Sequence, residues 1–377
     1  NWLHSFTLRV AARLNNPPLG LYVHMPWCVR KCPYCDFNSH ALKKELPARR
    51  YIQALIADLE ADLPLVWGRN VQSIYFGGGT PSLFSAELID EFLSAVRARL
   101  DLAPGLEVTL EANPGTVEHD SFSAYAQTGI NRVSLGVQSF DDDALKRLGR
   151  IHGCQEVDDC LQSLKTSGIS NFNIDLMFAL PGQELGQALD DVRRAVAAGP
   201  THISWYQLTL EPNTAFAAKP PALPEDDLAW EIQQRGLDML EDAGFAQYEI
   251  SAFEQGDMRC RHNLNYWTYG DFLAIGAGAH GKITDAGQQQ VRRYAKHRHP
   301  KQYMRGLDND DWLADRRVLG EKDLVFEFFL NRLRLRRAFS IDDFSARTGL
   351  DWGLVEGRVQ QAVDRGLLEL RHNRVST

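Results

Sequence analysis

Short apolar runs rich in β-branched and aromatic residues alternate with longer stretches in which apolar residues recur at every third or fourth position. The short runs predict buried strands, and the longer stretches predict amphipathic helices that cover a sheet. The predicted strands are Leu21–Met25, Ser73–Phe76, Glu107–Leu110, Arg132–Val137, Asn171–Met177 and His202–Leu208. The predicted helices between them are Tyr51–Leu65, Ala86–Leu100, Val117–Gln127, Cys154–Ser167 and Leu185–Ala198.

These strands begin about 25 to 50 residues apart, which is the length of one strand–helix unit with its loops. Six such units in succession predict an α/β fold with a parallel sheet, as a barrel, a partial barrel or a doubly wound sheet. In all of these folds ligands gather at the C-terminal ends of the strands.

Glycine, carboxylate or amide residues follow nearly every predicted strand. Turn formation alone explains a single glycine run, but it does not explain a polar residue at each strand end. We therefore predict one shared ligand site at this edge of the sheet. The residues behind this prediction are the segment Gly77–Thr80, Glu111, Asn113, Gln138, Ser139, Arg150, Asp175, Gln207 and Glu211.

The composition narrows the class of protein. A net charge of −8 over 377 residues argues against a protein that coats nucleic acid. No stretch approaches the ~20 apolar residues of a membrane-spanning helix, which leaves only a peripheral association with a membrane open. Six cysteines without a paired framework are typical of a reducing compartment, and we expect a cytoplasmic location.

Three of these cysteines, Cys28, Cys32 and Cys35, follow the first predicted strand with the spacing Cys-x₃-Cys-x₂-Cys. Three thiolates on one loop can hold three irons of a [4Fe–4S] cluster and leave the fourth iron open for a small molecule. The alternative is a zinc site that adds His24 or His40. It is less favoured, because structural zinc loops usually combine two separate ligand pairs.

The cysteine spacing, with the aromatic Tyr34 before the last thiol, resembles the signature of radical S-adenosylmethionine (SAM) proteins. In that family SAM binds the open iron, and an electron from the cluster cleaves SAM to a 5′-deoxyadenosyl radical. The motif order from Tyr22 to Asp175 is similar to the core of oxygen-independent coproporphyrinogen III oxidases and their relatives. This resemblance implies a parallel, partial (β/α)₆ barrel of the TIM type over residues 19–220.

The same resemblance implies roles for individual residues. Cys28, Cys32 and Cys35 would ligate the cluster, and Tyr22, Gly78 and Glu111 would contact its SAM. In the oxidases a second SAM is held by groups that match Tyr34, Gly79, Thr80, Gln138, Arg150 and Asp175. Two of these have a structural alternative, since Arg150 could cap a helix and Asp175 could pair with a cation in the barrel.

Two features point to a different branch. Those oxidases carry a fourth cysteine two positions after the third, where this chain has Phe37. The loop from Cys35 to His40 instead resembles the HemW branch, whose members are haem chaperones. A second motif, His262-Asn263-Leu264-Asn265-Tyr266-Trp267, matches the His-Asn-x-x-Tyr-Trp pattern of that branch, in which the histidine is linked to haem binding.

The chemistry of this second motif fits haem. A neutral imidazole such as that of His262 is a common axial ligand of haem iron. Tyr266 and Trp267 offer flat apolar surfaces that could pack on a porphyrin, and Asn263 adds a polar group. Outside this context, one histidine beside two aromatic residues would be an ordinary core cluster. The apolar run Phe272–Ile275 that follows predicts a further strand.

A different pattern begins at Leu319. A helix over Asp323–Leu335, a helix that starts at Ser340, a turn at Gly349, a helix over Trp352–Arg365 and the strand Leu367–Leu370 resemble a winged-helix α+β domain. Ten Lys/Arg and nine Asp/Glu in residues 319–377 give no strong field for phosphates, so we favour partner docking over DNA binding. We expect the returning strand of the wing to be missing and the C-terminus to be incomplete.

The sequence therefore predicts four segments: a leader over 1–18, the radical SAM barrel over 19–220, a family-specific extension over 221–318 and the winged-helix-like domain over 319–377. The favoured function is haem transfer to an acceptor protein, with an electron donor for the cluster. Alternatives are a coproporphyrinogen III oxidase and, less favoured, a winged-helix regulator. Whether the chain is an enzyme stays open.

Overall fold

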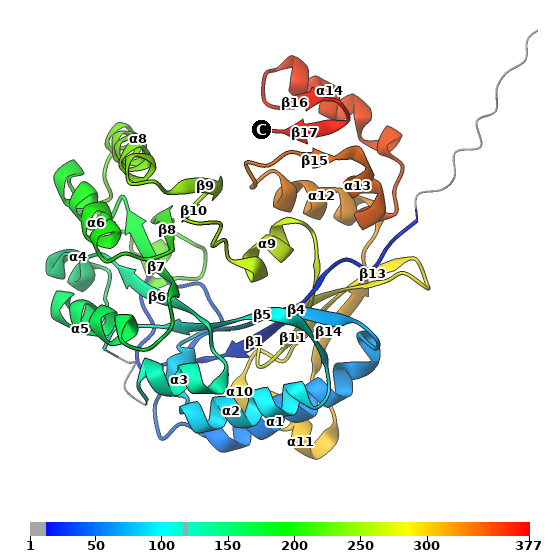
Figure 1. Ribbon diagram of the computed structural model, residues 1–377, viewed down its shortest axis with the longest axis horizontal. Helices are drawn as coiled ribbons and strands as arrows, with labels where there is room; N and C mark the ends of the chain where they lie inside the picture. Colours follow the sequence, from blue (N-terminus) through cyan, green and yellow to red (C-terminus); the bar gives the residue numbers. More distant parts are fainter. Residues whose placement is uncertain (1–12, 116–119) are drawn as a thin grey trace, which may run out of the picture.

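The computed structural model describes residues 13–115 and 120–377. Its centre is a curved twelve-stranded sheet with helices on the convex side (Figure 1). The strand order is β14 (Leu313–Val318), β13 (Gln290–Lys296), β12 (His280–Asp285), β11 (Asp271–Ile275), β1 (Leu19–Met25), β4 (Asn70–Gly78), β5 (Asp101–Ala112), β6 (Arg132–Gln138), β7 (Asn171–Phe178), β8 (His202–Gln207), β10 (Ala252–Glu254) and β9 (Ala246–Glu249).

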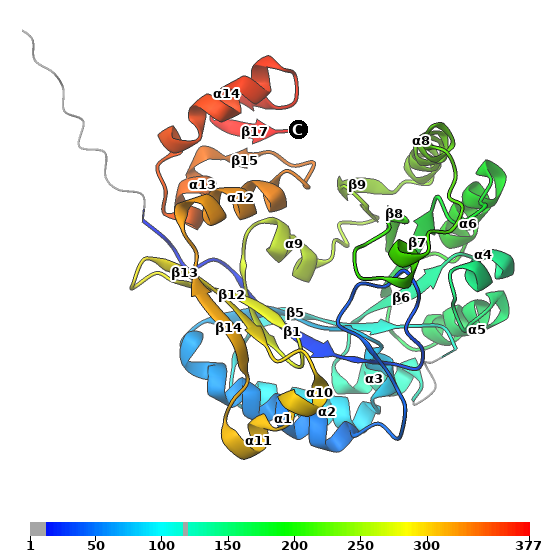
Figure 2. The same ribbon diagram turned by 180° about the vertical axis from the view of Figure 1, so that it is seen from behind.

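The helices of this part are α1 (Ala48–Asp62), α2 (Ala86–Arg97), α3 (Phe122–Thr128), α4 (Asp142–Arg147), α5 (Cys154–Lys165), α6 (Leu185–Ala197), α7 (Ala215–Ala218), α8 (Asp226–Asp242), α9 (Arg261–Trp267), α10 (Pro300–Tyr303) and α11 (Gly306–Asn309). Helix α9 lies on the concave side of the sheet, opposite α1, α2 and α3, in both views (Figures 1 and 2). No helix among the described residues is long and apolar enough to cross a bilayer.

The six predicted strands pair in parallel, which confirms the α/β fold with a partial barrel. A seventh parallel strand, β11, pairs with β1 and so extends the sheet on the side away from β4. Antiparallel strands then continue both edges. The apolar run predicted the strand over Phe272–Ile275. It did not predict that this strand pairs with β1, because pairing between segments far apart in the sequence leaves no local pattern.

Successive side chains of the parallel strands face either the hydrophobic core or the concave side of the sheet. In β6, Val133, Leu135 and Val137 point into the hydrophobic core under the outer helices. The residues between them, such as Ser134, face the concave side, because successive side chains of a strand point to opposite faces. The polar positions of these strands are therefore gathered inside the barrel.

One helix prediction needs correction. The helix expected over Val117–Gln127 begins at Phe122, where the hydroxyl of Ser121 accepts the backbone N–H of Ala124 as an N-cap. The first three residues of that expected helix lie outside the described residues.

The N-terminal segment is described only from Arg13 onwards, so most of the expected leader lies outside the described residues. Leu14 packs with Val291, Leu319 and Leu324 at the base of the C-terminal part. The backbone N–H of Asn15 also donates to the carbonyl of Ala346 at 3.1 Å. This stretch therefore ties the start of the barrel to the C-terminal part of the chain.

The C-terminal part contains α12 (Glu321–Arg332), α13 (Ile341–Thr348), α14 (Glu356–Asp364) and a small sheet of β15 (Phe339–Ser340), β17 (Arg374–Ser376) and β16 (Glu369–Arg371). Phe328, Phe339 and Phe344 form its core. The expectation that the wing lacks a returning strand is wrong. Strand β17 returns through residues 372 and 373, both at positive φ, and pairs with β16 and β15.

A buried ion cluster fastens α1 to the edge of the sheet. Lys296 on β13 contacts Asp58 and Asp62 on α1, with Nζ–Oδ distances of 2.5 and 2.7 Å. The hydroxyl of Tyr303 donates to the other oxygen of Asp58 at 2.6 Å. All four side chains are buried, so this network holds α1 against the sheet with little contact to solvent.

Candidate functional site

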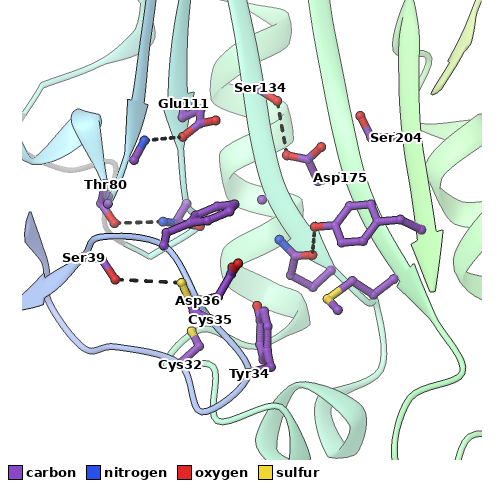
Figure 3. A pocket seen from close by; sticks show the side chains of 18 of the residues that line it. Cys32, Tyr34, Cys35, Asp36, Ser39, Thr80, Glu111, Ser134, Asp175 and Ser204 are labelled. Atoms are coloured by element: carbon purple, nitrogen blue, oxygen red, sulfur yellow. Dashed lines mark hydrogen bonds between the residues drawn. The ribbon is translucent and has the colours of Figure 1, made fainter. Parts of the chain in front are cut away.

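A cavity of about 540 Å³ opens on the concave side of the sheet, at the C-terminal ends of the parallel strands. The loop after β1 forms one wall, the strands β4 to β8 form the floor, and α9 and Arg334 close the far end. Figure 3 shows the side chains of the loop and of the strands pointing into it. Most of the residues that the sequence predicted for a shared ligand site line this cavity.

The cysteine loop is held by its backbone. The N–H groups of Gly79 and Thr80 donate to the carbonyls of Met25 and Trp27, both at 2.7 Å. A Cβ on Gly79 would lie 2.4 Å from the Trp27 oxygen, so only glycine permits this approach. The glycine triplet thus allows β4 to contact the loop directly. The loop contains two short strands, β2 (Trp27–Cys28) and β3 (His40–Ala41).

The thiols of Cys28, Cys32 and Cys35 all line the cavity. Burial raises the pKa of the Cys28 and Cys35 thiols. Among the described residues, no three His, Cys, Asp or Glu side chains converge as the ligands of one ion would. A [4Fe–4S] cluster needs one thiolate on each of three irons instead, and three thiols spread along one cavity wall fit that demand.

Both histidines of the zinc alternative are engaged elsewhere. The ring of His24 contacts the Tyr22 hydroxyl through Nδ1 and the Asn38 carbonyl through Nε2, each at 3.0 Å. Burial lowers the pKa of His24 to about 4, so its ring is neutral. His40 Nε2 lies 3.3 Å from the Arg298 carbonyl. Both ring nitrogens of His24 are thus engaged, and one ring nitrogen of His40 is directed away from the thiols.

Glu111, at the end of β5, is the buried carboxylate beside the glycine triplet. Its two oxygens accept the Tyr75 hydroxyl at 2.8 Å and the Gly78 N–H at 3.1 Å. Burial, with a smaller effect of Asp175, raises the pKa of Glu111 to about 7. This carboxylate is placed to accept hydrogen bonds from the ammonium group or from hydroxyls of a ligand at Gly78.

A second polar group occupies the middle of the floor (Figure 3). Asp175 accepts the Ser134 hydroxyl at 3.2 Å, and burial raises its pKa. The oxygen of Gln138, a residue held at a φ of 72°, accepts the Tyr206 hydroxyl at 2.9 Å. A non-glycine residue at positive φ is uncommon and marks a place where the surroundings dictate the backbone.

Arg150 reaches the cavity and does not act as a helix cap. Its guanidinium donates to the Asn113 side-chain oxygen at 2.6 Å and to the Gly136 carbonyl at 2.8 Å, and it lies 3.6 Å from the Cys32 sulfur. Asn113 in turn donates to the Thr80 hydroxyl at 3.0 Å. Tyr34 lines the cavity beside these groups. A cation is thus fixed next to the thiols.

The second motif is divided between two environments. Asn263 and Trp267 line the cavity, whereas His262, which is 1% exposed, and Tyr266 do not. Both ring nitrogens of His262 are bonded at 2.9 Å, Nδ1 to the Ser73 hydroxyl and Nε2 to the Tyr266 hydroxyl. Burial lowers the pKa of His262 to about 3, so it stays neutral at any physiological pH.

Tyr22 also lies outside the cavity lining, with its ring behind that of Tyr75 at a centroid distance of 6.4 Å. Several residues that line the cavity were not singled out from the sequence. The pattern that could have indicated them is a polar residue at every second position of an otherwise apolar strand. These residues are Tyr75, Arg132, Ser134, Asn173 and Ser204. Arg334 follows α12, and the position of the C-terminal part brings it to the cavity.

Comparisons with known proteins agree with this geometry. The model of the radical SAM superfamily matches residues 22–195, and that of the HemN C-terminal domain matches residues 319–377. Coproporphyrinogen III oxidase (HemN) from Escherichia coli shares the fold, with a TM-score of 0.81 at 22% identity over 97% of this chain and 88% of that chain. These matches define the class: a radical SAM scaffold with a HemN-type C-terminal domain.

The closer relatives define the family. The proteins named "Heme chaperone HemW" from Haemophilus influenzae and Escherichia coli are each 49% identical, over 93% of this chain and 92% of theirs. The mitochondrial radical S-adenosyl methionine domain-containing protein 1 of mouse is 35% identical over 80% of this chain and 67% of its own. The chain belongs to the HemW family, which confirms the resemblance seen in its motifs.

Proposed function

We propose that this chain is a haem chaperone that binds a [4Fe–4S] cluster, SAM and haem and passes haem to an acceptor protein. The identity of 49% along nearly the whole chain to proteins named as haem chaperones supports this proposal. The observation that carries it is one cavity onto which three thiols, the Glu111 carboxylate and the motif residues Asn263 and Trp267 all open.

In this proposal each wall of the cavity has its own ligand. Cys28, Cys32 and Cys35 hold the cluster, which supplies an electron and one open iron when it is bound. Gly78 and Glu111 receive the SAM at that iron, with Tyr22 supporting them from behind. A second SAM, where it binds, contacts Tyr34, Gly79, Thr80, Gln138, Arg150 and Asp175.

Haem binds at the far end of the cavity, on the ring of Trp267 and beside Asn263. Arg334 lies over that indole at 4.4 Å and donates to Glu249 at 3.0 Å, so a propionate that contacts Arg334 shares its guanidinium with Glu249. His262, with Tyr266 as its neighbour, becomes an axial ligand only if its bonds to Ser73 and Tyr266 open.

The oxidase alternative is not favoured. The likeness to coproporphyrinogen III oxidase is 22% in sequence and therefore concerns the fold alone. Phe37 stands where those oxidases carry a fourth cysteine, and its side chain is 58% exposed at the mouth of the cavity. We place the proposed function in the cytoplasm, with an electron donor for the cluster, because a reducing compartment preserves both thiolates and cluster.

Anaerobic haemin titration, followed by Soret absorbance, tests the proposal. We expect saturable binding to the cluster-loaded wild type and about tenfold weaker binding to Trp267→Ala, because a stacked aromatic surface is lost. Trp230→Ala on α8 is the matched control, since that indole is 63% exposed and does not line the cavity. A wild type that binds no haem would remove the chaperone proposal and make turnover of coproporphyrinogen the next test.

The pH dependence of SAM binding tests the role of Glu111. Only the carboxylate form attracts an ammonium group, and the pKa of Glu111 is raised to about 7. SAM affinity should therefore be roughly tenfold weaker at pH 6 than at pH 8, since each unit below a pKa costs a factor of ten. The measurement is a SAM titration of the cluster spectrum. Glu111→Gln should bind weakly at both values, and equal dependence in both proteins would contradict the role.

A further inference from the structure

His262 belongs to a continuous set of contacts that ends at the SAM site. Its ring stacks on Tyr75, with a centroid distance of 5.0 Å and an interplanar angle of 25°. The hydroxyl of Tyr75 donates to Glu111, and the other oxygen of Glu111 accepts the N–H of Gly78. The histidine that the sequence assigns to haem is therefore two contacts away from the carboxylate that faces SAM.

The local sequence explains why the ring lies there. Ser73 and Tyr75 are two positions apart on β4 and share its concave face, so one bonds the His262 ring and the other stacks on it. Glu107 on β5 accepts the backbone N–H groups of Arg261 and His262, both at 3.2 Å. This acceptor fixes the first turn of α9 and thereby the direction of the histidine side chain.

We propose that His262 and Tyr75 are positioning residues of the SAM site, in which the His262 ring fixes Tyr75 and Tyr75 fixes the Glu111 carboxylate toward Gly78. The inference rests on the proposed binding of SAM at Glu111. It adds a task for His262 that requires neither exposure to the cavity nor a bond to iron.

The surroundings of Tyr75 favour this assignment over simple packing. Tyr75 is buried in a cluster of three rings, in which Tyr22 lies at 6.4 Å and 24° from it, His262 stacks on it at 5.0 Å, and Tyr22 and His262 lie 6.3 Å from each other. Its hydroxyl has a charged acceptor, and hydrogen bonds to charged groups are stronger than those between neutral groups. A ring that can tilt would weaken this bond, so the stack on His262 keeps the carboxylate in place.

A double-mutant cycle on the cluster-loaded, full-length protein tests the inference. The readout is SAM affinity, measured by the change that SAM causes in the electron paramagnetic resonance spectrum of the reduced cluster. Tyr75→Phe should weaken SAM binding about tenfold through the lost bond to a carboxylate. His262→Ala should weaken it roughly threefold to tenfold in the wild type, and by less than twofold on top of Tyr75→Phe, because the two residues act in series.

Two further readouts separate positioning from general damage. Tyr75→Phe should move the pH midpoint of SAM binding upward, because the Tyr75 hydrogen bond lowers the pKa of Glu111. The other groups that face Glu111 are the N–H of Gly78, Asp175, Arg132 and Tyr22, and they are unchanged in this variant. His262→Phe keeps a flat ring against Tyr75 and should bind SAM more tightly than His262→Ala, although it has no nitrogen to offer haem.

The control is Tyr269→Phe, another buried tyrosine whose hydroxyl donates to a carboxylate, here Glu327 and away from the cavity. Its SAM affinity should equal that of the wild type. Additive losses in the double mutant, or an unchanged affinity and pH midpoint in Tyr75→Phe, would overturn the inference while wild-type SAM binding stands. A wild type that binds no SAM would instead overturn the proposed function of the site.

Discussion

Replacing Cys28, Cys32 or Cys35 by serine should each abolish the iron–sulfur cluster, and SAM binding with it. Each thiolate is expected to hold a different iron, so no remaining ligand can substitute for the one that is lost. The measurement is the iron content and the charge-transfer absorbance after anaerobic reconstitution, followed by a SAM titration. All three variants should retain the fold of the apo protein, since each of these thiols lies at the wall of the cavity and outside the hydrophobic core.

Cys260→Ser provides the control for this series. That thiol is also free and is fully buried, but it does not line the cavity, and its sulfur contacts Glu107 at 3.8 Å. Its replacement should leave cluster content unchanged. A variant of Cys28, Cys32 or Cys35 that still reconstitutes a full cluster would show that a fourth group in the chain ligates iron, and the assignment of the three thiols would have to be revised.

Local patterns were enough for most of the barrel. The β-branched runs and the three- and four-residue periods are written within each element, so strands such as β6 and helices such as α6 fall within one or two residues of their predicted bounds. The place of β11 next to β1 depends on two segments about 250 residues apart, and only tertiary packing fixes it. The antiparallel strands at both edges could not be placed from the sequence for the same reason.

The candidate site shows the same division. Residues at strand ends, such as Glu111, Asp175 and Gly79, could be found because the topology of a parallel sheet brings strand ends together. The direction of His262 could not be found, because it depends on the rotation of a seven-residue helix whose start is fixed by Glu107 on a distant strand. A motif specifies which residues are present, whereas the surrounding contacts decide which of them face a ligand.

The largest loss of stability should come from Lys296→Met. The substitution fills the same space but leaves Asp58 and Asp62 buried beside each other without their cation. Removing one partner of a buried ion pair typically costs about 3–5 kcal/mol, because the remaining charge keeps its desolvation penalty. We expect a loss of that size in the free energy of unfolding of the apo protein at pH 8, measured by urea titration.

The loss should shrink as the pH falls, and this dependence identifies its cause. Burial already raises the pKa of Asp58 to about 6 with Lys296 present, and Lys296 lowers it, so the variant raises it further. A carboxyl whose pKa is higher in the folded than in the unfolded state binds protons on folding, which stabilises the folded state as pH falls from 8 toward 5.

Lys146→Met is the matched control, since Lys146 and its partner Asp143 are each 76% exposed. It should change the free energy of unfolding by less than about 0.5 kcal/mol at either pH. An equal loss in both variants, or a loss in Lys296→Met that does not vary with pH, would mean that lost packing and not the buried charge sets the stability of this edge. Asp58 of the same network also accepts the N–H of Gly276, which follows β11. We therefore expect Lys296→Met to loosen the sheet next to β1, the strand that carries the cysteine loop, because β11 pairs with β1.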